Sequence, residues 1–160
     1  MGADLYIEKM DRTSQYRGYE VSDAARDAGY FRDCYNKNGL FAFLSFNTNQ
    51  IFSWWQFSNK AKYFNKEGDL KLKYIPEFLV YVKRAEKFML TSKIGYIQYG
   101  KCYFGFEKQK GKVYEDEEGY RYKKVKLTQK QLKEYKDWYF GLIQFLEKAI
   151  ELKSNIIWNI

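Results

Sequence analysis

The chain contains no histidine, and histidine is the side chain that most often acts as a general base near neutral pH. This absence excludes Ser–His and Cys–His catalytic sites, zinc sites built on histidine and two-histidine phosphoesterase sites. The sequence also lacks a Gly-x-x-x-x-Gly-Lys-Ser/Thr phosphate loop and a Gly-x-Gly-x-x-Gly dinucleotide fingerprint. We therefore expect a protein that is not an enzyme, with no catalytic residue, metal ligand or cofactor. A carboxylate-based metal enzyme is the weakest alternative.

Cysteine and long apolar runs are also scarce. The two cysteines, Cys34 and Cys102, lie far apart and form no Cys-x-x-Cys pair, so neither a disulfide framework nor a zinc ribbon is indicated. No stretch approaches the roughly 18 apolar residues that a membrane-spanning helix needs. The first residues show no signal-peptide pattern, and Tyr6 breaks the myristoylation pattern. These absences predict a cytoplasmic protein with reduced thiols and no membrane partner.

Aromatic side chains, in contrast, are abundant: the 160 residues include 16 Tyr, 13 Phe and 4 Trp. Such side chains bury a large area with few rotatable bonds, and a chain of this length can form one hydrophobic core. Charged residues make up 30% of the sequence and proline occurs once, which is typical of a folded rather than a disordered chain. We predict a single globular domain over residues 1–160.

The clearest element is a long helix near the C-terminus. Thr128 and Gln131 form a Thr-x-x-Gln capping box, and apolar side chains then recur with the helical period on one stripe. The stripe consists of Leu132, Tyr135, Tyr139, Leu142, Leu146 and Ala149. We expect this helix to extend to about Lys153. The closing "IIWNI" has strand character and is a natural partner for a strand in the N-terminal "ADLYIEKM".

Shorter elements complete the pattern. We predict an amphipathic helix from Pro76 to about Leu90, a short helix from Ser22 or Asp23 to Gly29, and a turn in "FNKEGDLK". The run "LFAFLSF" is either a buried helix or a hairpin arm, and we favour the helix. "GYIQYG" has strand composition, and "KVYEDEEGYRYKKVKL" alternates like a hairpin. The predicted fold class is α+β: a small, mostly antiparallel sheet packed with helices, including the long C-terminal one.

The stretch "GYFRDCYNKNG", residues 29–39, combines aromatic, charged and amide side chains, and the tandem tryptophans of "FSWW" follow it. An arginine can bind a phosphate or carboxylate with two hydrogen bonds, and aromatic side chains can stack on bases. Asp and Asn can bind sugar hydroxyls or a base edge. Together these residue types predict a site for a nucleotide-like anion. The candidate ligand-binding residues are Tyr30, Arg32, Asp33, Tyr35, Asn36, Trp54, Trp55, Lys60 and Lys62.

The same stretch also suits a structural role. Adjacent Arg and Asp side chains often pair with each other, Asn36–Gly39 is turn sequence, and aromatic clusters usually belong to a core. The interpretation that accommodates both views is a corner of the core that also presents Arg32 and Asn36 to a ligand.

The net charge of +8 is concentrated in the middle of the chain, where residues 41–112 carry thirteen basic and five acidic side chains. A basic surface attracts phosphates on nucleotides or nucleic acids, although a lysine-rich surface can also serve solubility alone. The acidic run Glu115–Glu118 is better explained as the solvated tip of a hairpin than as a metal site. No helix-turn-helix, zinc-finger or basic-zipper signature accompanies the charge.

Several motifs in order, "GADLYI", "GYFRDCYN", "SWW" and "FLEKAIEL" before a C-terminal strand, resemble an uncharacterised family of small phage and prophage proteins. The resemblance covers nearly the whole chain except residues 60–109. The family has serine in place of Cys34, which argues against a nucleophilic role there, a longer helix before "GYFRD", and a Gly-Leu pair where this chain has Gln50-Ile51-Phe52. Because the family has no established activity, the resemblance implies a phage setting and no mechanism.

Four hypotheses follow. The first is a non-enzymatic anti-defence protein in the cytoplasm of a bacterial host. It would capture a cyclic nucleotide or an ADP-ribose-type immune signal, as a homo-oligomer with pockets between subunits. The second is a protein–protein inhibitor of a host defence effector such as a CRISPR nuclease. The third is sequence-tolerant nucleic-acid binding, with an affinity that falls steeply with salt, and the fourth is the carboxylate enzyme.

Overall fold

The computed structural model describes residues 2–10, 29–34, 38–52, 61–99, 113–115 and 121–159. Its longest element is α6, Gln129–Glu151, which begins with the predicted capping box. Thr128 Oγ1 accepts a hydrogen bond from the Gln131 N–H, and Gln131 Oε1 accepts one from the Thr128 N–H. One stripe of α6 is buried, and it consists of Leu132, Tyr139, Leu142, Ile143, Phe145, Leu146 and Ala149.

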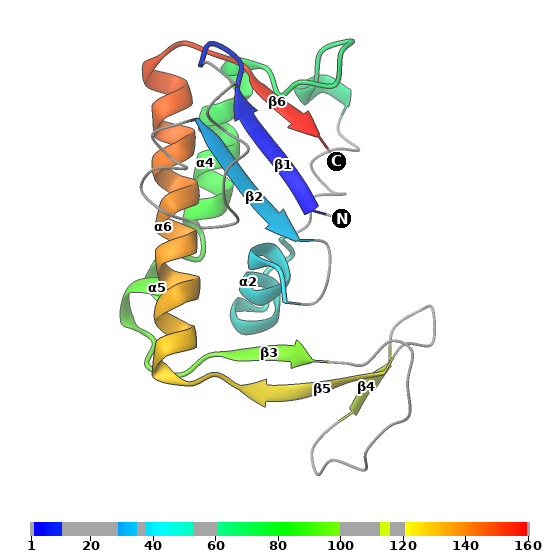
Figure 1. Ribbon diagram of the computed structural model, residues 1–160, viewed down its shortest axis with the longest axis vertical. Coiled ribbons are helices and arrows are strands. Elements are labelled where there is room, and N and C mark those ends of the chain that lie inside the picture. The colour runs from blue at the N-terminus through cyan, green and yellow to red at the C-terminus, as the bar shows by residue number, and fades with distance from the viewer. Residues whose placement is uncertain are drawn as a thin grey trace.

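Three antiparallel strands in the order β2-β1-β6 form the sheet that we call sheet A. They are β1 (Gly2–Ile7), β2 (Tyr30–Cys34) and β6 (Ile156–Asn159), and β6 is the predicted partner of the N-terminal strand (Figure 1). Alternate residues of a strand face opposite sides, and the inner side is apolar. Its fully or almost fully buried residues are Leu5, Ile7, Phe31, Ile156 and Trp158.

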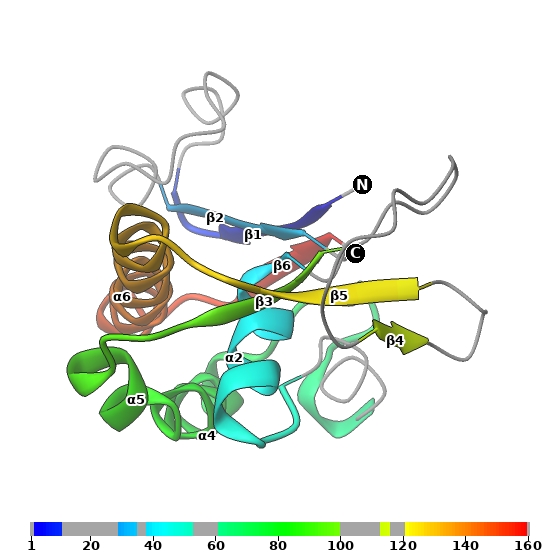
Figure 2. The same ribbon diagram turned by 90° about the horizontal axis from the view of Figure 1, so that it is seen from below.

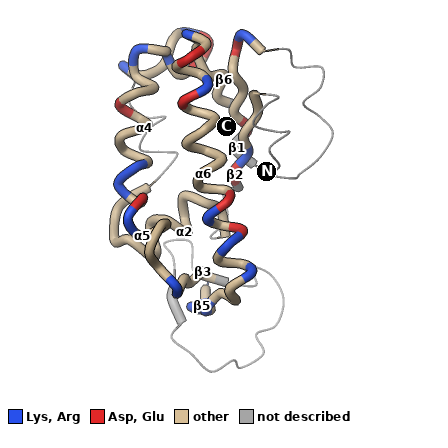
Figure 3. The backbone as a smooth tube through the Cα atoms, turned by 90° about the vertical axis from the view of Figure 1, so that its left-hand side faces the viewer, with Lys and Arg blue, Asp and Glu red and all other residues tan. Residues whose placement is uncertain are grey.

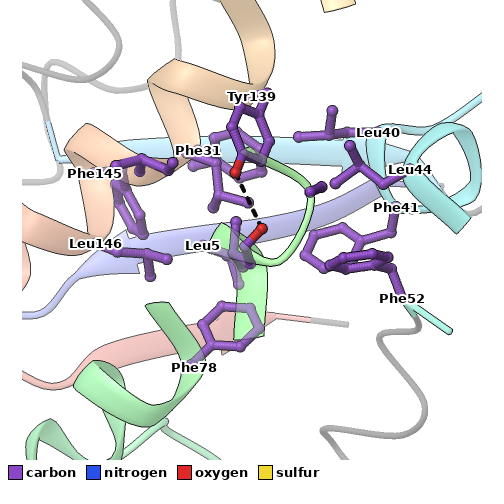
Figure 4. Close-up of a cluster of buried hydrophobic side chains, with 14 of the residues drawn as sticks. Leu5, Phe31, Leu40, Phe41, Leu44, Phe52, Phe78, Tyr139, Phe145 and Leu146 are labelled. Carbon is purple, nitrogen blue, oxygen red and sulfur yellow. Dashed lines mark hydrogen bonds between the residues drawn. The ribbon is translucent and has the colours of Figure 1, made fainter. Parts of the chain in front are cut away.

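Helices α6 and α4 (Ile75–Lys83) pack together over this inner side of sheet A (Figures 1 and 4). Aromatic rings from separate elements meet there. Phe31 of β2 lies 6.1 Å from Phe145 of α6, and Phe41 stacks at 6.3 Å on Phe78 of α4. Part of the aromatic surplus of the sequence therefore fills the core.

The single helix predicted from Pro76 to Leu90 is wrong in one respect, because it is broken into α4 and α5 (Glu86–Thr91). Pro76 does occupy the first turn, and the apolar stripe continues through both helices. At the break the Ala85 N–H bonds to the carbonyl of Val82, three residues back. The Val82 carbonyl also accepts a hydrogen bond of 3.1 Å from the Tyr139 hydroxyl of α6 (Figure 4). A buried side chain therefore binds the carbonyl at the point where the helix tightens.

A second set of three antiparallel strands, in the order β3-β5-β4, forms sheet B. Its strands are β3 (Tyr96–Tyr99), β5 (Arg121–Lys126) and β4 (Val113–Glu115), and the pairing of β4 with β5 confirms the predicted hairpin arms. Sheet B lies at the end of α6 where that helix begins, beside α2 (Leu40–Thr48), which confirms the helix favoured for "LFAFLSF" (Figures 1 and 2).

Two short 3₁₀ helices, η1 (Ala61–Tyr63) and η2 (Leu72–Tyr74), flank the predicted turn, in which Gly68 has a φ of 88°. The fold is α+β, and the strands of the described residues form two small antiparallel sheets rather than the one we predicted. The predicted helix over residues 22–28 and the tip of the hairpin around Glu118 lie outside the described residues. Among the helices of the described ranges, none has both the length and the apolar character needed to cross a bilayer.

Candidate functional site

The structure describes part of the predicted ligand site. Tyr30, Arg32, Asp33 and Lys62 lie within the described residues. Tyr35, Asn36, Trp54, Trp55 and Lys60 lie outside them. The described candidates are thus three residues of β2 and one residue of η1.

Asp33 points toward the core and is 1% exposed. Its Oδ1 accepts a hydrogen bond of 2.6 Å from the Leu40 N–H, and its Oδ2 accepts one of 3.2 Å from the Phe41 N–H. These N–H groups open α2, whose N-cap residue is Gly39 and has no side chain to cap the helix. Asp33 supplies that cap from the neighbouring strand, at the positive end of the helix dipole. This geometry gives Asp33 a structural role at a corner of the core, where it joins β2 to the start of α2.

Arg32 and Tyr30 lie on the opposite face of β2, where both contact Asp4 of β1. The Tyr30 hydroxyl donates to Asp4 Oδ1 at 2.8 Å, and Arg32 Nε lies 3.5 Å from the same oxygen. Burial, followed by the hydrogen bond to Asp4, raises the pKa of Tyr30. Arg32 is paired with Asp4 across the strands, and its neighbour Asp33 faces the other side, so the adjacent pair does not form an ion pair of its own. The carboxylate of Asp4 offsets the arginine charge.

Lys62 belongs to a different place in the molecule. Leu70 forms a bridge with Ile156 on the outer edge of β6, and Phe64 forms a bridge with Leu70. Since β1 and β6 separate β2 from this edge, a strand spacing of about 4.8 Å puts Leu70 roughly 14 Å from β2. The structure does not bring Lys62 together with Arg32.

Lys62 instead joins a group that we call the lysine–tyrosine cluster, which consists of Lys62, Tyr63, Lys71, Lys73, Tyr74 and Glu77. The ammonium groups of Lys62, Lys71 and Lys73 lie 5.8, 5.9 and 4.8 Å from the centroid of the Tyr74 ring. Distances of up to about 6 Å allow attraction between a cation and the ring face. Three positive charges therefore surround one half-buried aromatic ring.

The cluster is built on a buried tyrosine. Tyr63 is 1% exposed, its ring meets Tyr74 edge-on at 4.9 Å, and its hydroxyl donates to Glu77. Lys62 Nζ lies 4.0 Å from Glu77 Oε1, and Lys71 Nζ donates to the Lys62 carbonyl at 3.1 Å. The interaction with Tyr63 and the charge of Glu77 raise the pKa of Lys62 against the effect of desolvation. The amine is therefore charged at neutral pH.

No family model, curated protein or solved structure matches the chain.

The two arrangements differ in what they can bind. At the Asp4–Arg32 pair one positive charge meets one negative charge, whereas the lysine–tyrosine cluster sets three ammonium groups against the carboxylate of Glu77. Within the described ranges, Lys71 and Lys73 form no ion pair with a carboxylate. Within the same ranges, no three His, Cys, Asp or Glu side chains gather to hold a metal ion. The cluster is the better candidate for an anionic ligand.

Sequence reasoning found Lys62 by charge alone and missed its neighbours. The signal was present in "KLKY", where Lys71 and Lys73 precede Tyr74 directly. What joins them to Lys62 is a pair of backbone contacts. The Lys71 N–H bonds to the Tyr63 carbonyl at 2.9 Å, and the turn between residues 65 and 69 closes the loop.

Proposed function

We propose that the protein is a non-enzymatic binding protein that captures a nucleotide-like anion at the lysine–tyrosine cluster. One observation carries the proposal: the ammonium groups of Lys62, Lys71 and Lys73 surround the ring of Tyr74. Phosphate groups are the natural partners of clustered lysines. An aromatic ring among the lysines adds a surface for the planar base of a nucleotide.

The free energies of single ion pairs and of base stacking favour a ligand with more than one phosphate. An exposed ion pair contributes only about 0.2–1 kcal/mol, and Lys62 and Lys73 are exposed. One phosphate on one lysine would therefore bind weakly. A ligand that contacts three ammonium groups and also stacks, for roughly 1–3 kcal/mol, gains enough to be held. Cyclic dinucleotides and ADP-ribose have this combination of two phosphates and a base.

The phage resemblance suggests the biological setting of this ligand. A phage protein that sequesters a nucleotide signal would blunt host immunity without catalysis, which agrees with the absence of histidine. Sequestration by a homo-oligomer in the bacterial cytoplasm is part of the same proposal. The numerous aromatic side chains are suited to subunit contacts.

A second candidate function is protein–protein inhibition of a host defence effector, and exposed apolar side chains favour it. Val80 of α4, Leu90 of α5 and Ile51 after α2 are 65%, 62% and 64% exposed. Apolar side chains of this size at the surface can contribute to a protein interface. This alternative predicts stable co-purification with a host polypeptide and no small ligand.

The test is calorimetric titration of the full chain with ADP-ribose, a cyclic dinucleotide and inorganic pyrophosphate. The variant Lys62→Gln/Lys71→Gln/Lys73→Gln removes three charges and keeps the side-chain length. The control Lys87→Gln/Lys93→Gln/Lys130→Gln makes the same charge change at exposed lysines of other segments. We expect a nucleotide to bind the wild type and the control, and to bind the cluster variant about tenfold or more weakly.

Pyrophosphate should bind more weakly than the nucleotide because it has no base to stack on Tyr74. Equal losses in both triple variants would mean that net charge alone attracts the ligand, and would contradict the site. If none of the three probes binds and a native mass spectrum of the protein from host cells shows an attached polypeptide, the inhibitor function replaces the proposal.

A further inference from the structure

Strand β5 has the sequence "RYKKVK", with four basic residues and no acidic one. Because alternate residues share a face, Tyr122, Lys124 and Lys126 lie on the same side. Their register partners on β3 are Tyr96, opposite Lys126, and Gln98, opposite Lys124. We call these five residues the basic face of sheet B. It lies at the end of α6 where that helix begins, away from the lysine–tyrosine cluster on the edge of sheet A.

Aromatic rings lie next to the lysines of this face. The Lys124 ammonium is 4.0 Å from the centroid of the Tyr96 ring and 5.9 Å from that of Phe46 on α2. Lys124 and Lys126 are exposed, and Tyr96 and Phe46 are half buried. Proteins that bind single-stranded nucleic acids combine partly exposed aromatic rings with nearby lysines. The bases stack on the rings, and the phosphates contact the lysines.

Tyr96 is fixed in place by a side chain of α2. Asn47 Oδ1 accepts a hydrogen bond of 2.8 Å from the Tyr96 N–H, and Asn47 Nδ2 donates one of 2.7 Å to the Tyr96 carbonyl. The same Nδ2 also donates to the Phe43 carbonyl at 2.7 Å. The amide thus pairs with Tyr96 as a neighbouring strand would. Both bonds involve the backbone of Tyr96, so they hold this point of β3 against α2 and leave the ring available for contacts of its own.

Among the described residues, the lysines of this face have no carboxylate partner. Within that part of the chain, no ion pair involves Lys124 or Lys126. Helix α6 begins at Gln129, three residues after Lys126, and its first turn contains no acidic residue but does contain Lys130. Acidic residues are favoured there because the helix dipole makes this end positive. The sequence thus keeps positive charge where local stability would favour a carboxylate.

We propose that the basic face of sheet B binds single-stranded nucleic acid. Lys124 and Lys126 would neutralise phosphates, and Tyr96, with Phe46 beside it, would stack bases. Duplex nucleic acid fits less well because its bases are already stacked on each other. An acidic peptide would use the lysines but leave the rings without a partner. This activity is separate from the proposed capture of a small nucleotide, since the two sites share no residue.

The experiment measures fluorescence anisotropy of a labelled oligothymidylate of about 20 nucleotides, longer than the roughly 4–16 nucleotides that one small domain covers. The variants are Lys124→Gln/Lys126→Gln and Tyr96→Leu, which keeps the backbone bonds to Asn47. The matched control is Lys87→Gln/Lys153→Gln, with the same loss of charge at exposed lysines that belong to neither proposed site. Circular dichroism of each variant verifies the fold.

We expect the lysine variant to weaken binding about tenfold or more and to reduce the salt slope by about 1.4, since each single-strand phosphate contact contributes about 0.7. Tyr96→Leu should weaken binding about five- to hundredfold, and the control should bind like the wild type. The proposal is overturned if the control loses as much affinity as the lysine variant, if polyglutamate competes as well as the oligonucleotide, or if Tyr96→Leu has no effect. Absence of binding at low salt overturns it as well.

Discussion

Sheet A and sheet B each contain three antiparallel strands, but their side chains have different surroundings. Sheet A puts Leu5, Ile7 and Phe31 into the core against α4 and α6. Sheet B has the basic strand β5, whose residues are exposed or half buried. Charged positions of both signs occur along α6, whereas those of β5 are all basic (Figure 3). Sheet A therefore contributes mainly to the core, whereas sheet B carries most of its charge at the surface.

The two sheets are also attached in different ways. Sheet A is joined to α2 through Asp33, a buried carboxylate with two backbone hydrogen bonds. Sheet B is joined to the same helix through the amide of Asn47 and the half-exposed strand β3. One helix therefore carries both attachments, one at each end. Removing each attachment separately tests how independent the sheets are.

Asp33→Ala should have the largest effect. It leaves the buried N–H groups of Leu40 and Phe41 without their charged acceptor, and we expect the free energy of unfolding to fall by about 3 kcal/mol. Urea denaturation followed by circular dichroism measures this. Arg32→Gln is the control because its side chain is partly exposed, and it should cost well under about 1 kcal/mol. Similar losses for both variants would contradict the helix-capping role.

Asn47→Ala should have an intermediate and local effect. It removes both hydrogen bonds to Tyr96, for a cost of about 1–2 kcal/mol, and should loosen β3 without loosening β1. Hydrogen exchange of the amides of β3 and β1 distinguishes these regions. Equal acceleration in both strands would show that the sheets open together, and that the distinction between them does not extend to stability.

The smallest effect concerns the outer face of sheet A at alkaline pH. The folded-state pKa of Tyr30 is raised above its ordinary value of 10.0, so the folded state keeps a proton that the unfolded state releases. This contribution to stability is present below about pH 10 and is lost as the pH rises above that value. Tyr30→Phe should therefore flatten the alkaline loss of stability, as measured by urea midpoints from about two pH units below to about one unit above the ordinary tyrosine pKa.

Tyr139 is the matched comparison for that experiment, because burial raises its pKa as well. Tyr139→Phe also removes the hydrogen bond to the Val82 carbonyl, so it should lower stability at every pH by about 1 kcal/mol. If Tyr30→Phe leaves the alkaline slope unchanged, Tyr30 is not the group that titrates.

Elements specified by neighbouring residues could be predicted from the sequence. The capping box of Thr128 and Gln131 and the arms of the β4–β5 hairpin depend on local pattern. The strand character of the last residues is local as well, although their pairing with β1 joins the two ends of the chain. The break between α4 and α5 could not be predicted, because the side chain that binds the Val82 carbonyl comes from Tyr139, distant in sequence. The helix period alone continues through that break.

The candidate site shows the same limit. Because Arg32 and Asp33 are adjacent in the sequence, we placed both in one binding site. In strand β2, however, adjacent side chains point to opposite faces of the sheet. Whether a residue of "GYFRD" faces inward depends on the register with β1, which the residue types do not fix. The clustering of Lys62 with Lys71 and Lys73 depends likewise on the turn that brings their segments together.

The bridges of Leu70 have a further consequence for the outer edge of sheet A. Leu70 exchanges both backbone hydrogen bonds with Ile156, and among the described residues the segment around Phe64 lies outermost beyond it. An open strand edge is a template on which another chain can add a strand. Here the exposed Lys62 and Lys66 lie on either side of that segment. Two molecules that approach each other edge to edge would bring these positive charges together. We therefore expect their repulsion to disfavour aggregation through this edge.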